Sequence, residues 1–213
     1  MLLSTLGWPG AGRPRTLEPI HASDAGAATQ NLPTVMDGDI GIFIYMINNN
    51  PTPANVVPSG WTTISTQGLN FWRVGASYKK LVAADSGAAV TGQTSGSFAG
   101  STLIVLRSFP LCNTLTLSTV NSQATASDPT LQTVDTSGLQ NLAAIFGITV
   151  HGGAGSNTAT GTIATEGGQL NANSARRFFL LSYERSSQFG NKTIDMNQAG
   201  DPNVMFSGYL EIT

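Results

Sequence analysis

Short apolar segments separated by polar clusters run through most of the chain. The segment "DIGIFIYMI" (39–47) is apolar at almost every position, which is typical of a central strand covered on both faces. "FWRVGASYKKLV" (71–82) alternates instead, with Trp72 and Val74 on one face and Arg73 on the other. Clusters of Gly, Asn, Asp and Ser, the residues of turns, separate such segments. This pattern predicts an all-β protein built from many short strands.

A faint internal repeat divides these strands into two similar halves. Three segments recur in the same order about one hundred residues later: "GIFIYMI" (41–47) as "AIFGITV" (144–150), "ASYKK" (76–80) as "LSYER" (181–185), and "STLIVLRS" (101–108) as "MFSGYLEI" (205–212). The halves could interleave as the two sheets of a jelly-roll-like antiparallel β-sandwich, or form two tandem sandwiches. Because each half alone is short of core residues, we predict one sandwich domain over residues 31–213.

Residues 1–30 lack the strand pattern. "GWPGAGRPRTLEP" contains Gly and Pro, which interrupt both helices and strands, and "HASDAGAATQ" is small and polar. We therefore predict an extended N-terminal arm, which is either ordered against a partner or wrapped over its own domain. Its large and charged side chains Trp8, Arg13 and Arg15 are the expected contacts with a neighbour.

Trp61 stands directly after the turn "PSG" (58–60). A ring of this size can bury on the order of 200 Å² and close the end of a sandwich. Trp61 could instead stack on a sugar, as could Trp72, if the two rings are exposed. The following residues place Thr63 on the face of Trp61 and Ile64 on the opposite face, which favours burial of the Trp61 ring.

Charge is scarce in this chain. Charged residues make up 10% of the 213 residues, against about 25% in a typical soluble domain, and the net charge is −2. Such a surface attracts neither nucleic acid nor anionic membranes, and no apolar run reaches the roughly 18 residues of a bilayer-spanning helix. We expect no nucleic-acid or membrane partner. The opening "MLLSTLGWPG" lacks the basic start of a signal peptide, which predicts synthesis in a cytoplasm without export.

Few residues are candidates for catalysis or metal binding. The single cysteine, Cys112, precedes a strand-like run and is expected to be a small buried residue. His151 in "VHGGAGSN" is expected in a loop, because no G-x-S-x-G nucleophile motif accompanies it. Asp37 and Asp39 supply too few oxygens for Ca²⁺ and are expected to stabilise a turn. We predict no catalytic, metal or cofactor site, and therefore a protein that is not an enzyme.

The order "DGDIGIFIYMI … PSGWTTIS … FWRVGASYKKLVAADSG … STLIVLRSF" resembles a β-sandwich of tailed-phage structural proteins and related bacterial surface proteins. In that family a "DGDLLV"-like strand is followed by a "PxGW" turn and by "LAVYYKVA"-like and "VAAYRG"-like strands. The matching residues here are Asp37-Gly38-Asp39, Pro58-Gly60-Trp61, Tyr78-Lys79 and Leu106-Arg107. The resemblance covers roughly residues 32–212 and departs from the family where "LRS" replaces "YRG".

This resemblance implies a non-enzymatic virion component made in the host cytoplasm, such as a capsid decoration or cement protein, a head fibre or a tail part. It implies self-association, possibly as a trimer, and contacts with other capsid or tail subunits. It carries over no catalytic residues. Two alternatives stay open: a carbohydrate-binding or receptor-binding module of a tail fibre, which would bind a host glycan, and more remotely an acyl or glycosyl hydrolase.

Overall fold

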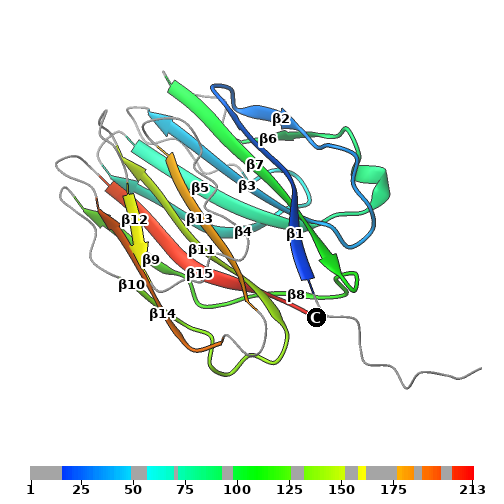
Figure 1. The fold of residues 1–213 in the computed structure, drawn as a ribbon. Coiled ribbons are helices and arrows are strands. Elements are labelled where there is room, and N and C mark those ends of the chain that lie inside the picture. The colour runs from blue at the N-terminus through cyan, green and yellow to red at the C-terminus, as the bar shows by residue number, and fades with distance from the viewer. Residues whose placement is uncertain are drawn as a thin grey trace, which may run out of the picture.

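The fold is almost entirely β (Figure 1). The computed structural model describes residues 16–48, 57–69, 72–92, 98–125, 132–151, 158–161, 177–184, 189–197 and 203–213. These residues form fifteen strands and one short 3-10 helix, η1 (Ala83–Asp85), and every strand pair among them is antiparallel. The prediction of an all-β antiparallel sandwich is confirmed. No helix in the described part of the chain is long and apolar enough to cross a membrane.

The first half of the chain forms one large sheet, here called the N-terminal sheet. Its strands in spatial order are β1 (Thr16–Ala25), β7 (Phe98–Phe109), β3 (Ile40–Asn48), β5 (Trp72–Lys80) and β4 (Thr62–Leu69). A two-stranded ribbon of β2 (Thr29–Asn31) and β6 (Ala89–Thr91) lies beyond its outer face (Figure 1).

The second half forms the C-terminal sheet. Its strands are β13 (Arg177–Glu184), β11 (Leu142–His151) and β15 (Asn203–Ile212), with β8 (Leu115–Leu117) and β9 (Asn121–Thr125) both pairing with β15. A small sheet of β10 (Gln132–Asp135), β14 (Asn191–Asn197) and β12 (Thr158–Gly161) lies on the outer side (Figure 1). The two larger sheets are stacked face to face between these outer elements.

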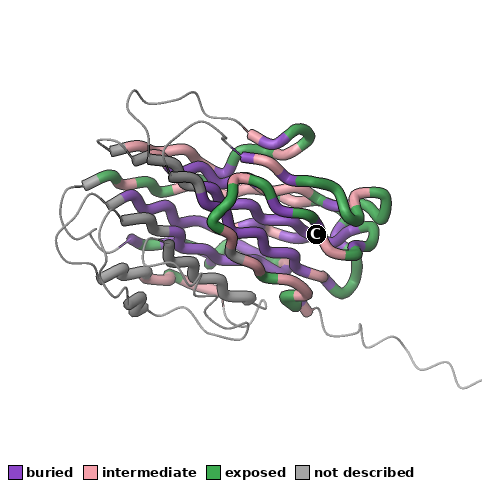
Figure 2. The backbone as a smooth tube through the Cα atoms, turned by 90° about the horizontal axis from the view of Figure 1, so that it is seen from above, coloured by how far each residue is buried: buried purple, intermediate pink, exposed green. Residues whose placement is uncertain are grey.

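The facing sides of the two large sheets form one hydrophobic cluster, here called the inner core, and buried residues run through both layers in Figure 2. Full burial of such a side chain stabilises the fold by about 1.5–3 kcal/mol. Its members come from both halves of the chain: Leu17, Ile40, Ile42, Ile44, Ile64, Val74, Ala76, Ile104, Leu106, Cys112, Leu142, Ala144, Phe146, Ile148, Val204, Phe206, Leu210 and Ile212.

The internal repeat reappears in the strand order. β3 lies between β5 and β7, and β11 lies between β13 and β15, so the three repeated segments occupy equivalent places in the two sheets. The expected interleaving of the halves into jelly-roll sheets is not what the described strands show, because each half builds its own sheet. Strands close in sequence pair more readily than distant ones, which favours this arrangement.

Residues that coincide when the two halves are aligned by sequence do not point to the same face of their sheets. Phe43 and Phe146 coincide when the two halves are aligned by sequence, and both are fully buried. Phe146 belongs to the inner core, but Phe43 points to the outer face of the N-terminal sheet. Because successive strand residues point to opposite faces, a shift by one residue exchanges the two environments.

The outer face of the N-terminal sheet is also apolar. Its cluster, here called the outer cluster, consists of Leu32, Val35, Phe43, Tyr45, Leu81, Val90, Leu103 and Val105. The β2–β6 ribbon and neighbouring connections supply Leu32, Val35, Leu81 and Val90. Strand β3 is therefore covered on both faces, which confirms the prediction made from its continuous apolar sequence.

Residues 16–30 belong to the sandwich rather than to an extended arm. Thr16–Ala25 form the edge strand β1, which pairs with β7, and Leu17 is buried in the inner core. The expectation of an arm over residues 1–30 is therefore wrong for this part, which wraps over its own domain. Pro19 suggested an interruption, but it stands at a register shift of an edge strand, where proline is tolerated.

Candidate interaction surface

The predicted arm contacts Trp8, Arg13 and Arg15 lie outside the described residues. The described chain begins at Thr16, whose partner across the β1–β7 ladder is Phe109 at the end of β7. The surface around Phe109 is therefore the one next to which residues 1–15 join the sandwich.

Trp61 packs on the outer cluster. Its backbone N–H donates to the Pro58 carbonyl at 3.0 Å, which closes the turn before β4. Its ring lies edge-on to Phe43, with 6.2 Å between the ring centroids, and covers Gly41. A Cβ at position 41 would lie 2.6 Å from the Trp61 ring, so this close approach needs glycine. The ring is partly buried on the outer face of the sheet rather than between the two sheets.

Trp72 is the first residue of β5, and its backbone pairs with Asn48 and Leu69. Thr62, which follows Trp61, pairs with Tyr78 near the other end of β5. The two tryptophans thus stand at opposite ends of the β4–β5 pair. Glycan binding stays an untested alternative.

The turn before β3 is organised by Asp39, which is completely buried. Asp39 Oδ2 accepts a hydrogen bond from the Met36 N–H at 2.8 Å, and the Asp39 N–H donates to the Met36 carbonyl at 3.1 Å. Gly38 between them has a φ of +86°, a conformation that favours glycine. The prediction that this aspartate stabilises a turn is confirmed.

Arg107 neutralises the buried Asp39 carboxylate. Arg107 Nε donates to Oδ1 at 2.9 Å and Nη2 donates to Oδ2 at 2.7 Å, a bidentate pair that ties the start of β3 to β7. The hydrogen bonds to Asp39 raise the pKa of Arg107. A carboxylate withdrawn from water needs such a partner, because its desolvation alone costs several kcal/mol.

The loop after β5 is fixed to the same turn. Gly38 N–H donates to the Leu81 carbonyl at 3.0 Å, Leu81 N–H donates to the Asp39 carbonyl at 2.7 Å, and Ala83 N–H donates to Asp37 Oδ1 at 2.8 Å. We call the turn 36–39, the loop 81–88 and the segment 107–112 together the Asp39 corner. Its connections are held by directional bonds at three places, so it presents a defined surface.

A salt bridge closes this loop on itself. Lys79 Nζ lies 2.7 Å from Asp85 Oδ1, and the Val82 N–H donates to Asp85 Oδ2 at 3.0 Å. Burial on its own would raise the pKa of Asp85, but the hydrogen bonds from Lys79 and Val82 outweigh it, so the pKa lies below its usual value.

The residues that carry the resemblance to virion proteins meet at this end of the N-terminal sheet. Asp39 pairs with Arg107, Trp61 covers the face of β3, and Lys79 pairs with Asp85. Asp39 and Arg107 contact each other, whereas the Trp61 ring contacts Phe43 of the outer cluster. The observed role of Asp39, Arg107 and Lys79 is to hold the Asp39 corner in place.

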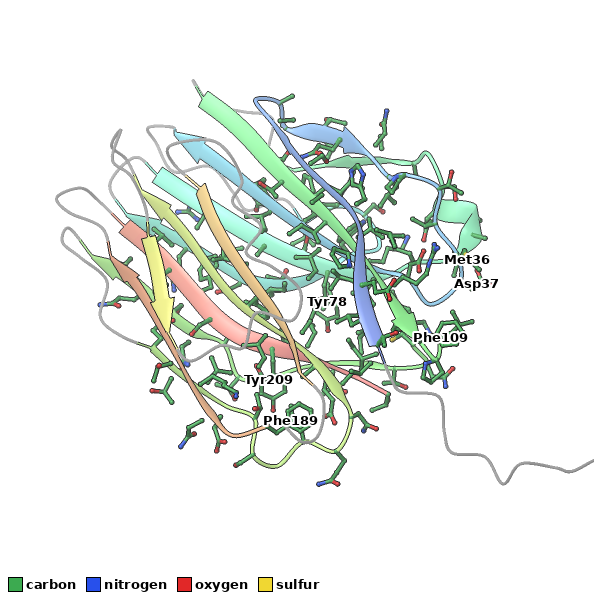
Figure 3. The ribbon with its side chains drawn as sticks, viewed as in Figure 1. Met36, Asp37, Tyr78, Phe109, Phe189 and Tyr209 are labelled. Carbon is green, nitrogen blue, oxygen red and sulfur yellow. The ribbon has the colours of Figure 1, made fainter. Side chains whose placement is uncertain are left out.

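An apolar surface adjoins this corner. Met36, Val82, Phe109 and Leu111 are each between 44% and 50% exposed, and we call these four side chains the apolar patch. Leu111 lies against Gly38, whose Cβ position would be 3.2 Å from Leu111 Cβ, and Figure 3 shows Met36, Asp37 and Phe109 at the same end of the molecule. Exposed apolar groups that gather in one place mark interaction sites.

Sequence reasoning did not single out the apolar patch. Met36, Val82 and Leu111 lie in connections rather than in alternating strands, so hydrophobic periodicity gives no signal for them. Their common location depends on the hydrogen bonds of the Asp39 corner.

Cys112 and the two histidines lie in separate parts of the described chain. Cys112 is buried, as predicted, and burial raises the pKa of its thiol to about 11 against an opposing effect of Lys80, so the thiolate nucleophile is scarce at neutral pH. His21 contacts Ser23 Oγ at 2.9 Å, and burial lowers the pKa of His21. His151 ends strand β11 and does not lie in the expected loop. No group of three or more His, Cys, Asp or Glu in the described residues could hold a metal.

Comparisons of the chain with protein-family models, with curated proteins and with solved structures gave no match.

Proposed function

We propose that this chain is a non-enzymatic structural protein of a tailed-phage virion, either a capsid decoration or cement protein, a head fibre or a tail component. Support comes from the resemblance of its motifs to virion β-sandwiches. The observation that carries the proposal is the apolar patch on the Asp39 corner, beside the point where residues 1–15 join the sandwich. Self-association, possibly as a trimer, belongs to the same proposal.

The patch suits attachment to other proteins because it is apolar and held rigidly. Full burial of one such side chain contributes about 1.5–3 kcal/mol, and each of the four is already half-buried, so one contact yields a few kcal/mol. Preorganisation by the Asp39 corner reduces the entropy lost on binding. Repetition of this modest contact over many subunits of a particle would produce tight attachment through avidity.

Deletion of residues 1–15 tests the proposal. Because β1 begins at Thr16, this deletion leaves the sandwich intact, whereas deletion of residues 1–30 would remove an edge strand and Leu17 from the inner core. We expect the shortened protein to be soluble, with unchanged circular dichroism, and to be missing from purified particles by mass spectrometry. Thr63→Ser, on the exposed side of β4, is the matched control and should be incorporated normally.

Incorporation of the shortened protein at normal stoichiometry would contradict attachment through residues 1–15. The copy number of the full-length protein sharpens the proposal further. Hundreds of copies per particle would indicate a capsid cement, and a few dozen or fewer would indicate a head fibre or a tail part. Complete absence of the full-length protein from particles would reject the virion function itself.

A further inference from the structure

We propose that Arg73, on the outer face of the N-terminal sheet, binds the carboxylate of an acidic sugar. The site is independent of the proposed virion function. Arg73 carries a positive charge that the described part of the chain leaves without an acceptor, and the groups beside it on β4 favour a sugar over a peptide as the ligand.

Arg73 stands near the start of β5 and points to the outer face of the sheet. Val74 and Ala76 belong to the inner core, so Arg73 and Gly75, which alternate with them, lie on the opposite face. The partner of Arg73 on the neighbouring strand β4 is Gly68, and β4 is the edge strand of the sheet. The guanidinium is therefore placed one strand from the edge, next to a residue without a side chain.

Within the described residues, the Arg73 guanidinium has no acceptor. Its Nε atom is buried and has no hydrogen-bond partner, although the side chain as a whole is only partly buried. Three other cations of the described chain each have an acceptor: Lys79 has Asp85, Arg107 has Asp39, and Lys80 has the Asn113 carbonyl. Buried polar groups almost always have a partner, so the exception at Arg73 points to a group supplied from outside the chain.

The charge balance around Arg73 favours a carboxylate. The connections that leave this end of the sheet, residues 49–56, 70–71 and 93–97, contain no Asp, Glu, Lys or Arg in their sequences. One guanidinium therefore balances a singly charged carboxylate, whereas a doubly charged phosphate would keep an excess charge. The planar fork of a guanidinium also fits the two oxygens of a carboxylate. Because burial of Nε removes part of its solvation, the cation attracts an anion more strongly than a fully exposed arginine would.

The groups beside Arg73 favour a sugar as the carrier of that carboxylate. Thr66 and Gly68 pair with Gly75 and Arg73, so both lie on the outer face of β4. They offer a hydroxyl group and open backbone rather than apolar side chains. The Tyr45 phenol lies over Gly75 and would overlap a Cβ there, so it bounds the site on the side of β3. A sugar acid combines one carboxylate with several hydroxyl groups, which suits this polar surface, whereas a peptide ligand also needs apolar side chains to pack against.

Arginine side-chain NMR of the full chain tests this site. In protein labelled with ¹⁵N-arginine, the variant Arg73→Lys identifies the Nε–H resonance of Arg73. We expect glucuronate to shift this resonance in a saturable way, and its uncharged methyl ester to leave it in place. Arg73→Gln should weaken glucuronate binding, followed by saturation transfer to the sugar, at least about tenfold, because a charged hydrogen-bond donor is lost. Lys80→Gln, which removes a cation at the other end of β5, is the matched control and should bind like the wild type.

Each other outcome overturns the inference. An Arg73 resonance that glucuronate does not move, or that the methyl ester moves equally, shows that Arg73 does not recognise the carboxylate. A response to acetate as strong as that to glucuronate shows an adventitious ion only, and a stronger response to N-acetylglutamic acid amide shows a peptide site. Equal losses in Arg73→Gln and Lys80→Gln show an effect of net charge. Because Arg73 is partly exposed, Arg73→Gln should keep the circular dichroism of the wild type. If it does not, the comparison of acid and ester on the wild-type protein decides alone.

Discussion

The two large sheets share one design on their inner faces and differ on their outer faces. Alternate residues of β3 and of β11 fill the inner core, and each central strand has equivalent neighbours. On the outside, the N-terminal sheet is covered by an apolar cluster around Phe43 and Leu103. Over the C-terminal sheet, contacts with the small sheet and the neighbouring connections include several polar ones.

The polar contacts of the C-terminal side are specific. Ser207 is completely buried on β15 and donates to Gln132 Oε1 of the small sheet, and Asn121 Nδ2 of β9 donates to the Thr133 carbonyl of the small sheet at 2.9 Å. Apolar burial is non-directional and tolerates a varied cover, whereas each buried polar group requires a positioned partner. Both covers contain such contacts, since Gln30 of β2 donates to Ser101 of β7, but the cover of the N-terminal sheet is mainly apolar and adjoins the Asp39 corner with its exposed patch.

The largest expected effect is the loss of an outer-cluster ring. Phe43→Ala should lower the free energy of unfolding by about 3–5 kcal/mol, because the fully buried ring leaves a cavity under Trp61 and Tyr45. Urea unfolding followed by circular dichroism measures it. Phe146→Ala in the inner core is the matched comparison and should cost the same. A loss below about 1 kcal/mol for Phe43→Ala alone would mean that the outer cluster is a loose cover rather than a second core.

The next effect concerns the buried ion pair on the mainly apolar side. Arg107→Gln should cost about 3 kcal/mol, because it leaves the Asp39 carboxylate buried without a cation. Asp39→Asn should cost less, since Arg107 is 34% exposed and its guanidinium can reach water. Urea unfolding of both variants measures the order. The reverse order, with Asp39→Asn the costlier, would show that the turn at Met36 rather than the charge is what Asp39 supports.

Some features of the two sheets could be predicted from the sequence. The continuous apolar run of β3 predicted its two covered faces, and the alternation in β5 placed Val74 on one face, which joins the inner core. Those features depend on neighbouring residues, so local periodicity reports them. The two aspartates before β3 predicted a turn for the same reason.

The remainder depends on contacts between distant residues. Asp39 and Arg107 are 68 positions apart, and nothing local pairs them. Phe43 and Phe146 coincide in the sequence alignment of the two halves, yet Phe43 lies on the outer face of its sheet and Phe146 on the inner face. A shift of one residue moves every side chain of a strand to the opposite face, and the alignment alone does not reveal such a shift. The apolar patch was missed because turns have no hydrophobic period. The segments that surround the candidate surface were therefore the least predictable part of the fold.

A smaller effect tests the polar cover of the C-terminal sheet. Ser207→Ala should cost about 1–2 kcal/mol, because it leaves the buried Gln132 amide without its hydroxyl partner. The double variant Ser207→Ala, Gln132→Leu should recover most of that loss, since removing both partners leaves no unsatisfied group. Urea unfolding of the two variants measures this difference. If the double variant is no more stable than Ser207→Ala, the contact between the two sheets is not what stabilises the cover.

The smallest expected effect distinguishes an aspartate that is paired with a charged side chain from an aspartate that is bound by a backbone N–H. Asp85 is bound by Lys79 and Val82, and Asp135 by the Ser137 N–H, and the pKa of each lies below its usual value. Ionised carboxylates therefore stabilise the fold above their unfolded pKa of about 3.9, and this contribution is lost as the pH falls through the lower folded pKa. At pH 7 we expect Asp85→Asn to cost at most about 1 kcal/mol, less at high salt, and nothing at strongly acidic pH. Any effect of Asp135→Asn should likewise vanish at strongly acidic pH but depend little on salt, because its partner, the Ser137 N–H, carries no charge. Urea unfolding across pH and salt would contradict this distinction if the two variants responded to salt alike.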